Sequence, residues 1–170
     1  MKEGQFNFLW ITEFPFFEWN EETSTWDAMH HPFTMPMEEC LPYLESDPGS
    51  VRAKAYDMVL NGTELLSGSI RITDWQLQER MFRVLGLSKE EIEMKFGFLV
   101  EAYKYGAPPH GGSGMGLDRL AMVMAEADSL RDVIAFPKVQ NASELMSACP
   151  APADPAALSD LGIAVVEEKE

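Results

Sequence analysis

Three polar side chains that could bind a ligand lie in one apolar, β-compatible stretch of the sequence: Glu64, Ser67 and Arg71. Alternate residues of a strand share a face, so Ser67 and Arg71 lie together and a regular strand would put Glu64 opposite. A bulge at Ser67-Gly68, which the glycine permits, would bring all three to one side. An arginine in an apolar strand needs a carboxylate or a phosphate, and its planar fork fits a carboxylate through two hydrogen bonds. Two interpretations stay open: a ligand site and an internal Glu64–Arg71 ion pair.

The glycine-rich segment 111–116 is a second candidate, because it is similar to a phosphate-cradling loop. Its spacing matches neither of the common nucleotide fingerprints. Arg119 follows at the start of an expected helix, where a guanidinium can reach a bound phosphate or stack on a flat ring. Asp118 is placed to hold that arginine. A surface arginine in the first turn of a helix is the alternative interpretation.

The three histidines, His30, His31 and His110, do not predict a metal site. Neighbouring residues on an extended loop point in opposite directions and rarely bind one ion. His30 and His31 precede two closely spaced prolines, which predict such a loop, and a histidine there suits a polar contact with a substrate. Cys40 and Cys149 lack the spacing of a zinc or redox motif and are expected to be free thiols.

The elements that must position these residues follow one another as strand, short helix, hairpin, two helices, glycine-rich segment and helix. This order favours an α+β fold, an antiparallel sheet flanked by helices. The first strand has no hairpin partner next to it in the sequence, so its neighbours in the sheet could lie outside this chain. The expected elements are a strand over 5–19 broken at Pro15, a short helix near 37–44, a hairpin of 55–60 and 64–72 turned by Asn61-Gly62, a helix capped by Asp74, a helix with a Ser88/Glu91 capping box, and a helix over 117–127.

Composition restricts the class of protein. The chain has 170 residues, 46% of them hydrophobic, which suits one medium domain. The net charge of −15 excludes a free-standing nucleic-acid binder, because such proteins draw their affinity from basic residues. The sequence shows neither a secretory signal nor an apolar run of membrane-spanning length, so we expect a soluble, intracellular protein.

Eight segments, in order, resemble the C-terminal part of the catalytic domain of bacterial-type aspartyl-tRNA synthetase, a class II aminoacyl-tRNA synthetase. The resemblance covers essentially the whole chain. Residues 116–120 look like the third class II signature, and together with the paired histidines they favour aspartate over the asparagine and lysine relatives. The segments are 14–18, 28–34, 56–64, 68–72, 95–98, 108–110, 116–120 and 131–138.

The resemblance implies the C-terminal portion of the class II catalytic fold over residues 1–148, with a C-terminal extension over 149–170 that packs on that domain or trails from it. It implies an aspartate–tRNA ligase, which activates L-aspartate with ATP to aspartyl-adenylate and transfers the aspartyl group to tRNA. The full-length enzyme would be a cytoplasmic homodimer with no membrane association.

The resemblance also implies roles for single residues, none of them as general acid or base. His30 and Arg71 would bind aspartate, and Arg71 would clamp its side-chain carboxylate. Glu64 would bind ATP through Mg²⁺, with Ser67 as a second ligand of the metal. The ATP site would further include Gly116, Leu117, Asp118 and Arg119, of which Arg119 would contact the γ-phosphate and the adenine.

In the family, an anticodon-binding domain and two class II signatures lie upstream of the segments found here. Half of an active site would therefore be absent from this sequence, and we expect the isolated chain not to aminoacylate tRNA. The alternatives are a non-catalytic nucleotide-binding paralogue and another class II-like ligase, such as an asparagine-forming synthetase. Loss of Arg71 or Arg119 would favour the non-catalytic nucleotide-binding paralogue, and the sequence retains both residues.

Overall fold

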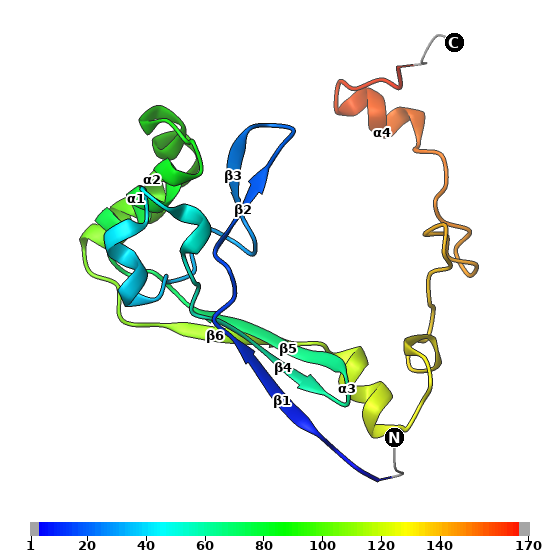
Figure 1. The fold of residues 1–170 in the computed structure, drawn as a ribbon. Helices are drawn as coiled ribbons and strands as arrows, with labels where there is room; N and C mark the ends of the chain where they lie inside the picture. Colours follow the sequence, from blue (N-terminus) through cyan, green and yellow to red (C-terminus); the bar gives the residue numbers. More distant parts are fainter. Residues whose placement is uncertain (1–3, 167–170) are drawn as a thin grey trace. The chain divides into compact units, whose positions relative to one another are not determined.

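Four antiparallel strands form the sheet that carries the candidate residues, in the order β1-β4-β5-β6 (Figure 1). The computed structural model describes residues 4–166, and the chain divides into two units, residues 1–117 and 118–170. The sheet belongs to the first unit, and α1 and α2 gather at one end of it, which confirms the expected α+β fold. The strands are β1 Phe8–Thr12, β2 Phe17–Asn20, β3 Thr25–Ala28, β4 Ala55–Leu60, β5 Thr63–Ile70 and β6 Gly111–Met115; the helices are α1 Trp75–Val84, α2 Lys89–Lys104, α3 Leu117–Met124 and α4 Pro155–Asp160, with 3-10 turns at Glu38–Tyr43, Pro48–Ser50 and Leu130–Asp132.

The central hairpin of β4 and β5 is turned by Asn61-Gly62, as predicted. Both residues have a positive φ, 51° and 86°, which a two-residue turn of the type I′ class requires. β1 pairs with β4 in antiparallel register, with Phe8 opposite Leu60 and Thr12 opposite Tyr56. One neighbour of the first strand therefore lies further along the same sequence, and since β1 stands at the edge of this sheet, the expectation of a neighbour outside the chain stays a prediction for its other side.

β5 contains a bulge, but not where the sequence predicted it. Ser67 lies opposite Asp57 and Leu66 opposite Met58, whereas the next residue of β4, Val59, lies opposite Glu64. Leu65 is therefore the extra residue, and the predicted bulge at Ser67-Gly68 is corrected to this position. Residues directly opposite each other share a face, so the bulge places Glu64 on the face of Ser67.

Gly68 stays in the regular ladder because packing, rather than a bulge, requires a glycine there. A Cβ at this position would lie 2.4 Å from the carbonyl oxygen of Gly112 and 2.5 Å from the Tyr56 ring. The Tyr56 hydroxyl donates a hydrogen bond to the same Gly112 oxygen over 3.1 Å. Tyr56 thus covers the glycine and joins β4 to β6 across β5.

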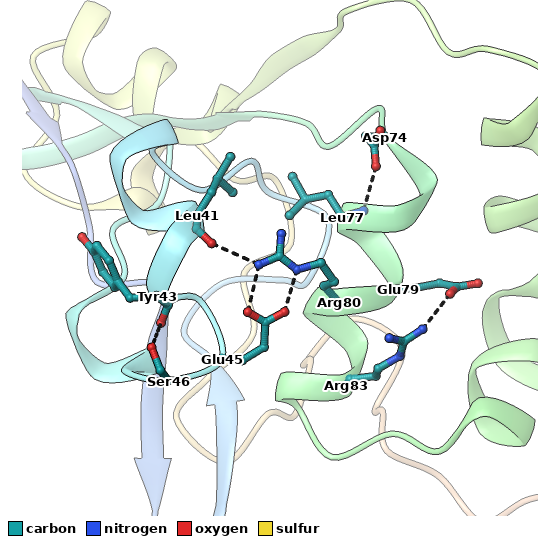
Figure 2. Close-up of polar contacts among 9 residues, drawn as sticks. All are labelled: Leu41, Tyr43, Glu45, Ser46, Asp74, Leu77, Glu79, Arg80 and Arg83. Atoms are coloured by element: carbon teal, nitrogen blue, oxygen red, sulfur yellow. Dashed lines mark hydrogen bonds and ion pairs between the residues drawn. The ribbon is translucent and has the colours of Figure 1, made fainter.

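The predicted helix caps of α1 and α2 are confirmed. The Asp74 side chain accepts a hydrogen bond from the backbone of Leu77 over 2.8 Å, and Ser88 and Glu91 form a reciprocal capping box. The expected helix near 37–44 is a 3-10 helix with Pro42 inside it, since proline cannot donate the backbone bonds of an α-helix. Figure 2 shows how α1 is fixed to this turn: Arg80 bonds both oxygens of Glu45 and the carbonyl of Leu41.

The core of the first unit consists of two apolar clusters. The larger one includes residues of the 3-10 helix Glu38–Tyr43 and of α1, and Phe82, Ile92 and Val100 form the smaller one between α1 and α2. Phe82 stacks on Phe96 with ring centroids 4.5 Å apart. Ile92 and Val100 thus place one face of α2 in the core. The larger cluster contains Phe16, Phe17, Cys40, Leu44, Val51, Ala53, Ala55, Ile72, Leu77 and Met81.

The segment expected as one strand over 5–19 forms two strands. β1 ends at Thr12, and β2 pairs with β3 in a hairpin that the sequence did not predict. Trp19 and Trp26 lie directly opposite each other in this hairpin, with ring centroids 5.2 Å apart and edge to face. Such aromatic cross-strand pairs stabilise short hairpins.

The second unit consists of α3, a 3-10 turn, α4 and the segments between them. Glu144 and Cys149 form an isolated bridge, and the expected boundary between residues 148 and 149 falls inside this unit and stays a prediction. Both cysteines are free thiols, as expected. Within residues 4–166, no helix has the length and apolar character that a bilayer crossing requires.

Candidate functional site

A cavity of about 460 Å³ opens on one face of the sheet, between β5, β6 and residues 30–32, which we call the histidine loop. Three of the predicted site residues, His30, Ser67 and Arg71, line it. Three residues that were not predicted as ligand contacts, His31, Thr34 and Ser69, line it as well. The structure therefore brings the loop and the polar strand together at one site.

The glycine-rich segment forms a wall of this cavity as a strand and not as the loop that the sequence predicted. In β6, Gly112 lies opposite Ser69 and Gly114 opposite Ser67. A Cβ on Gly112 or Gly114 would meet nothing within 4 Å. These two glycines are therefore not required by packing, and they leave open space where side chains would project over the site.

Arg71 is oriented by His31. Its Nη1 atom lies 3.2 Å from His31 Nδ1, and the backbone N–H of Phe33 donates to the same nitrogen over 3.3 Å. A guanidinium only donates hydrogen bonds, so Nδ1 is the unprotonated acceptor and His31 is neutral, with its proton on Nε2. Burial, and then the charge of Arg71, lower the pKa of His31 from its ordinary value of 6.5. The uncharged ring leaves the positive charge of Arg71 available to a ligand.

The backbone around Arg71 connects three segments of the site. Thr34 and Arg71 form an antiparallel bridge, and the N–H of Arg71 donates to the carbonyl of His110 over 3.0 Å. Arg71 follows directly after β5 and continues its extended backbone. Hydrogen bonds therefore fix the backbone from which the Arg71 side chain projects. This rigidity suits a residue that must meet a ligand in one geometry.

His30 and His110 contribute in other ways. The His30 ring packs edge to face against Phe14, with centroids 5.1 Å apart, and remains exposed at the cavity. His110 also lines the cavity, and its Nδ1 lies 3.0 Å from the carbonyl of Pro108. Among residues 4–166, no cluster of three or more His, Cys, Asp or Glu side chains is arranged to hold a metal ion.

Two buried polar atoms near the site have no hydrogen-bond partner among the described residues: Ser69 Oγ and Asp57 Oδ1. Ser69 is only 4% exposed and lines the cavity between Ser67 and Arg71. Asp57 lies directly opposite Ser67 and so shares its face. Sequence reasoning missed both residues. The predicted hairpin held no signal for Asp57, because a regular register pairs it with Leu66 and only the unpredicted bulge at Leu65 places it opposite Ser67.

The other predicted residues lie outside the cavity lining. Glu64 is exposed on β5, on the face of Asp57 and Ser67. The N–H of Gly116 donates to the carbonyl of Leu65 over 2.9 Å, directly after β6. Leu117 begins α3 and is 74% exposed. Asp118 and Arg119 occupy the first turn of α3, in the second unit.

Comparison with known proteins places this arrangement in context. Residues 1–140 match the family model of the tRNA synthetases class II (D, K and N). The chain is 60% identical over 168 residues to the aspartate–tRNA ligase of Ruminiclostridium cellulolyticum, and 57% identical over 168 residues to the aspartate–tRNA(Asp/Asn) ligase of Lachnoclostridium phytofermentans. Both alignments cover 99% of this chain and 28% of the relative, so the chain spans little more than a quarter of the length of these relatives.

Solved structures show the same fold at lower identity. The aspartyl tRNA synthetase from Entamoeba histolytica superimposes with a TM-score of 0.58 at 24% identity, over 81% of this chain and 24% of that chain. An asparaginyl-tRNA synthetase from Entamoeba histolytica, in complex with asparaginyl-adenylate, gives a TM-score of 0.57 at 22% identity, over 81% of this chain and 26% of that chain. The sheet and helices described above are thus a portion of the class II synthetase fold.

Proposed function

Because this chain belongs to the class II tRNA synthetases of the D, K and N group, we propose that it is the C-terminal part of the catalytic domain of an aspartate–tRNA ligase. The observation that carries the proposal is the Arg71 guanidinium at the wall of a cavity, oriented by a neutral histidine. Such a fixed cation selects a negatively charged side chain, and the relatives at 60% and 57% identity are named for aspartate.

In this proposal, Arg71 clamps the side-chain carboxylate of aspartate. Its two terminal nitrogens match the two carboxylate oxygens, whereas the amide of asparagine would place a donor against a donor. His30, exposed at the cavity, contacts the amino acid as a further polar partner. The unpartnered Ser69 hydroxyl, between Ser67 and Arg71 on the same face, supplies an additional hydrogen bond.

ATP and Mg²⁺ complete the proposed site. Magnesium prefers oxygen ligands and is commonly held by one or two carboxylates together with substrate phosphates. The sheet face offers such a set, since Asp57 has an unpartnered buried oxygen and shares its face with Glu64 and Ser67. When bound, the ion would neutralise charge that develops on the phosphates. By the family resemblance, the proposal also assigns ATP binding to Gly116, Leu117, Asp118 and Arg119, with Arg119 on the γ-phosphate and the adenine.

The proposed reaction needs orientation more than acid–base chemistry. The α-carboxylate of aspartate attacks the α-phosphate of ATP, pyrophosphate leaves, and the resulting aspartyl-adenylate gives its aspartyl group to the terminal ribose of tRNA. The chain's own residues hold the amino acid: Arg71 fixes the far carboxylate, so the α-carboxylate is presented in one direction. The complete ligase would be a cytoplasmic homodimer, in keeping with the family resemblance.

A segment exchange tests this function. The corresponding 168 residues of the Ruminiclostridium cellulolyticum ligase are replaced by this chain, and aspartate-dependent ATP–pyrophosphate exchange is measured. We expect an active chimera that Arg71→Met inactivates. Arg83→Met serves as the matched control, because Arg83 lies on α1, outside the cavity lining, and pairs with Glu79. A folded but inactive chimera, or equal activity of the two variants, would contradict the proposal.

A further inference from the structure

The histidine loop makes few backbone hydrogen bonds; one of them joins the N–H of Thr34 to the carbonyl of His31 over 3.5 Å. Before the loop, the N–H of Met29 donates to Phe16 over 3.0 Å; after it, the N–H of Ile72 donates to the carbonyl of Phe33 over 3.0 Å. Between them, Pro32 has no N–H to donate. The carbonyl of Pro32 accepts a hydrogen bond of 2.8 Å from Nε2 of Gln78.

Gln78 is unusual for its surroundings. It is completely buried on α1, next to the core residue Leu77, and its Oε1 has no partner among the described residues. Burying a primary amide costs free energy unless its hydrogen bonds are made. An apolar residue would fill the same space without that cost. The bond to Pro32 is therefore the feature that a glutamine supplies here and an apolar residue would not.

Helix α1, which carries Gln78, is held in place by its own hydrogen bonds. The Gln78 side chain therefore donates to Pro32 from a fixed position. Asp74 caps α1, and Arg80 joins it to Glu45 and Leu41 (Figure 2). At the other end of the contact, Pro32 directly follows His31, whose ring accepts from Arg71. A chain of contacts thus leads from α1 through Gln78 and the loop to the guanidinium.

We propose that Gln78 is a positioning residue of the aspartate site: by holding the Pro32 carbonyl, it sets the orientation of the His31 ring and through it that of Arg71. The identity of the ligand rests on the function proposed above. The positioning role itself concerns only contacts within this chain, so the two can be tested separately.

The test compares Gln78→Met with Leu77→Val in the full chain. Methionine keeps the length of the side chain but cannot donate to Pro32, whereas Leu77→Val disturbs the same helix without touching the loop. The first readout is the nitrogen spectrum of ¹⁵N-labelled histidine, followed through a pH titration. In the wild type and in Leu77→Val, we expect His31 in the Nε2–H form with a pKa below 6.5. In Gln78→Met, we expect mixed tautomers and a pKa that returns toward 6.5, because the released ring is less buried and lies farther from Arg71.

The second readout is aspartate binding, which we expect to weaken about tenfold in Gln78→Met, the effect of about one lost neutral hydrogen bond. Circular dichroism first confirms that both variants are folded at the temperature used. If the His31 spectrum of Gln78→Met matches that of Leu77→Val, the positioning role is refuted, whatever the binding data show. If the His31 spectrum of Gln78→Met changes but none of the three proteins, the wild type included, binds aspartate, the positioning role stands and the proposed ligand is wrong.

Discussion

Two glycines on neighbouring strands should respond in opposite ways to the addition of one methyl group. Gly68 of β5 and Gly112 of β6 both lie near the cavity, and neither has a positive φ. At Gly68, a Cβ would meet the Gly112 oxygen at 2.4 Å and the Tyr56 ring at 2.5 Å. At Gly112, it would meet nothing within 4 Å. The structure therefore predicts that Gly68→Ala is destabilising and Gly112→Ala is not.

The magnitude follows from which atoms must move. Overpacking a well-packed site costs about 1–3 kcal/mol, and the upper end applies at Gly68 because one of the clashing atoms belongs to the backbone of β6. Replacing glycine also removes freedom from the unfolded chain, which returns about 0.4–1 kcal/mol. We expect Gly68→Ala to lower the free energy of unfolding by about 2 kcal/mol and Gly112→Ala, which meets no clash, to raise it by about 0.4–1 kcal/mol.

Urea unfolding, followed by tryptophan fluorescence, measures both variants under the same conditions. Equal denaturant slopes would show that the midpoints can be compared as stabilities. The two variants should also differ in function, because Gly112 shares the face of Ser69 and its methyl group would enter the cavity. A Gly68→Ala protein as stable as the wild type, or equal losses at both positions, would refute the reasoning about β6.

Three further outcomes follow from single side chains. Ser88→Ala should lower the free energy of unfolding by about 1 kcal/mol in thermal melts, because it removes half of the capping box of α2. Ser69→Ala should leave the melting temperature unchanged but weaken aspartate binding measured by calorimetry, because Ser69 Oγ makes no bond within the described structure; a destabilised variant with unchanged binding would contradict this. Lowering the pH should remove stability below pH 6.5, since the unfolded chain then binds a proton that the lowered pKa of His31 resists in the folded state. Urea titrations between pH 7 and 5 test this, and in Arg71→Gln the loss should be smaller.

Much of the local structure could be predicted from the sequence because its signals act over a few residues. The Asn61-Gly62 turn, the Asp74 cap and the Ser88 box are set by hydrogen bonds and φ angles within two to four positions. The pairing of β1 with β4 was missed, because nothing within β1 indicates a partner so far along the chain. The position of the bulge was missed for a related reason: the role of Gly68 depends on Tyr56 and Gly112, which are distant in sequence.

The candidate site shows the same division. Arg71 and Ser67 could be found because a charged or polar residue in an apolar strand stands out, and His30 because its loop does. Ser69 is as polar as Ser67 and stands in the same strand, but only the structure shows that its hydroxyl is buried and unpartnered. Gln78 reads as an ordinary helical residue until its contact with Pro32 is seen.

Two neighbouring strands build one wall of the site: β5 supplies polar side chains, and β6 supplies backbone with glycines at the cavity. β5 and the residue directly after it present Ser67, Ser69 and Arg71 along one face, and the pairing with β4 and β6 fixes the spacing of the two serines. β6 adds backbone but no side chains at Gly112 and Gly114, so space remains over the polar face. A side chain larger than hydrogen there would be tolerated by the fold and would still obstruct a ligand. Glycine at these positions is therefore better explained by what the cavity must admit than by what the sheet must pack.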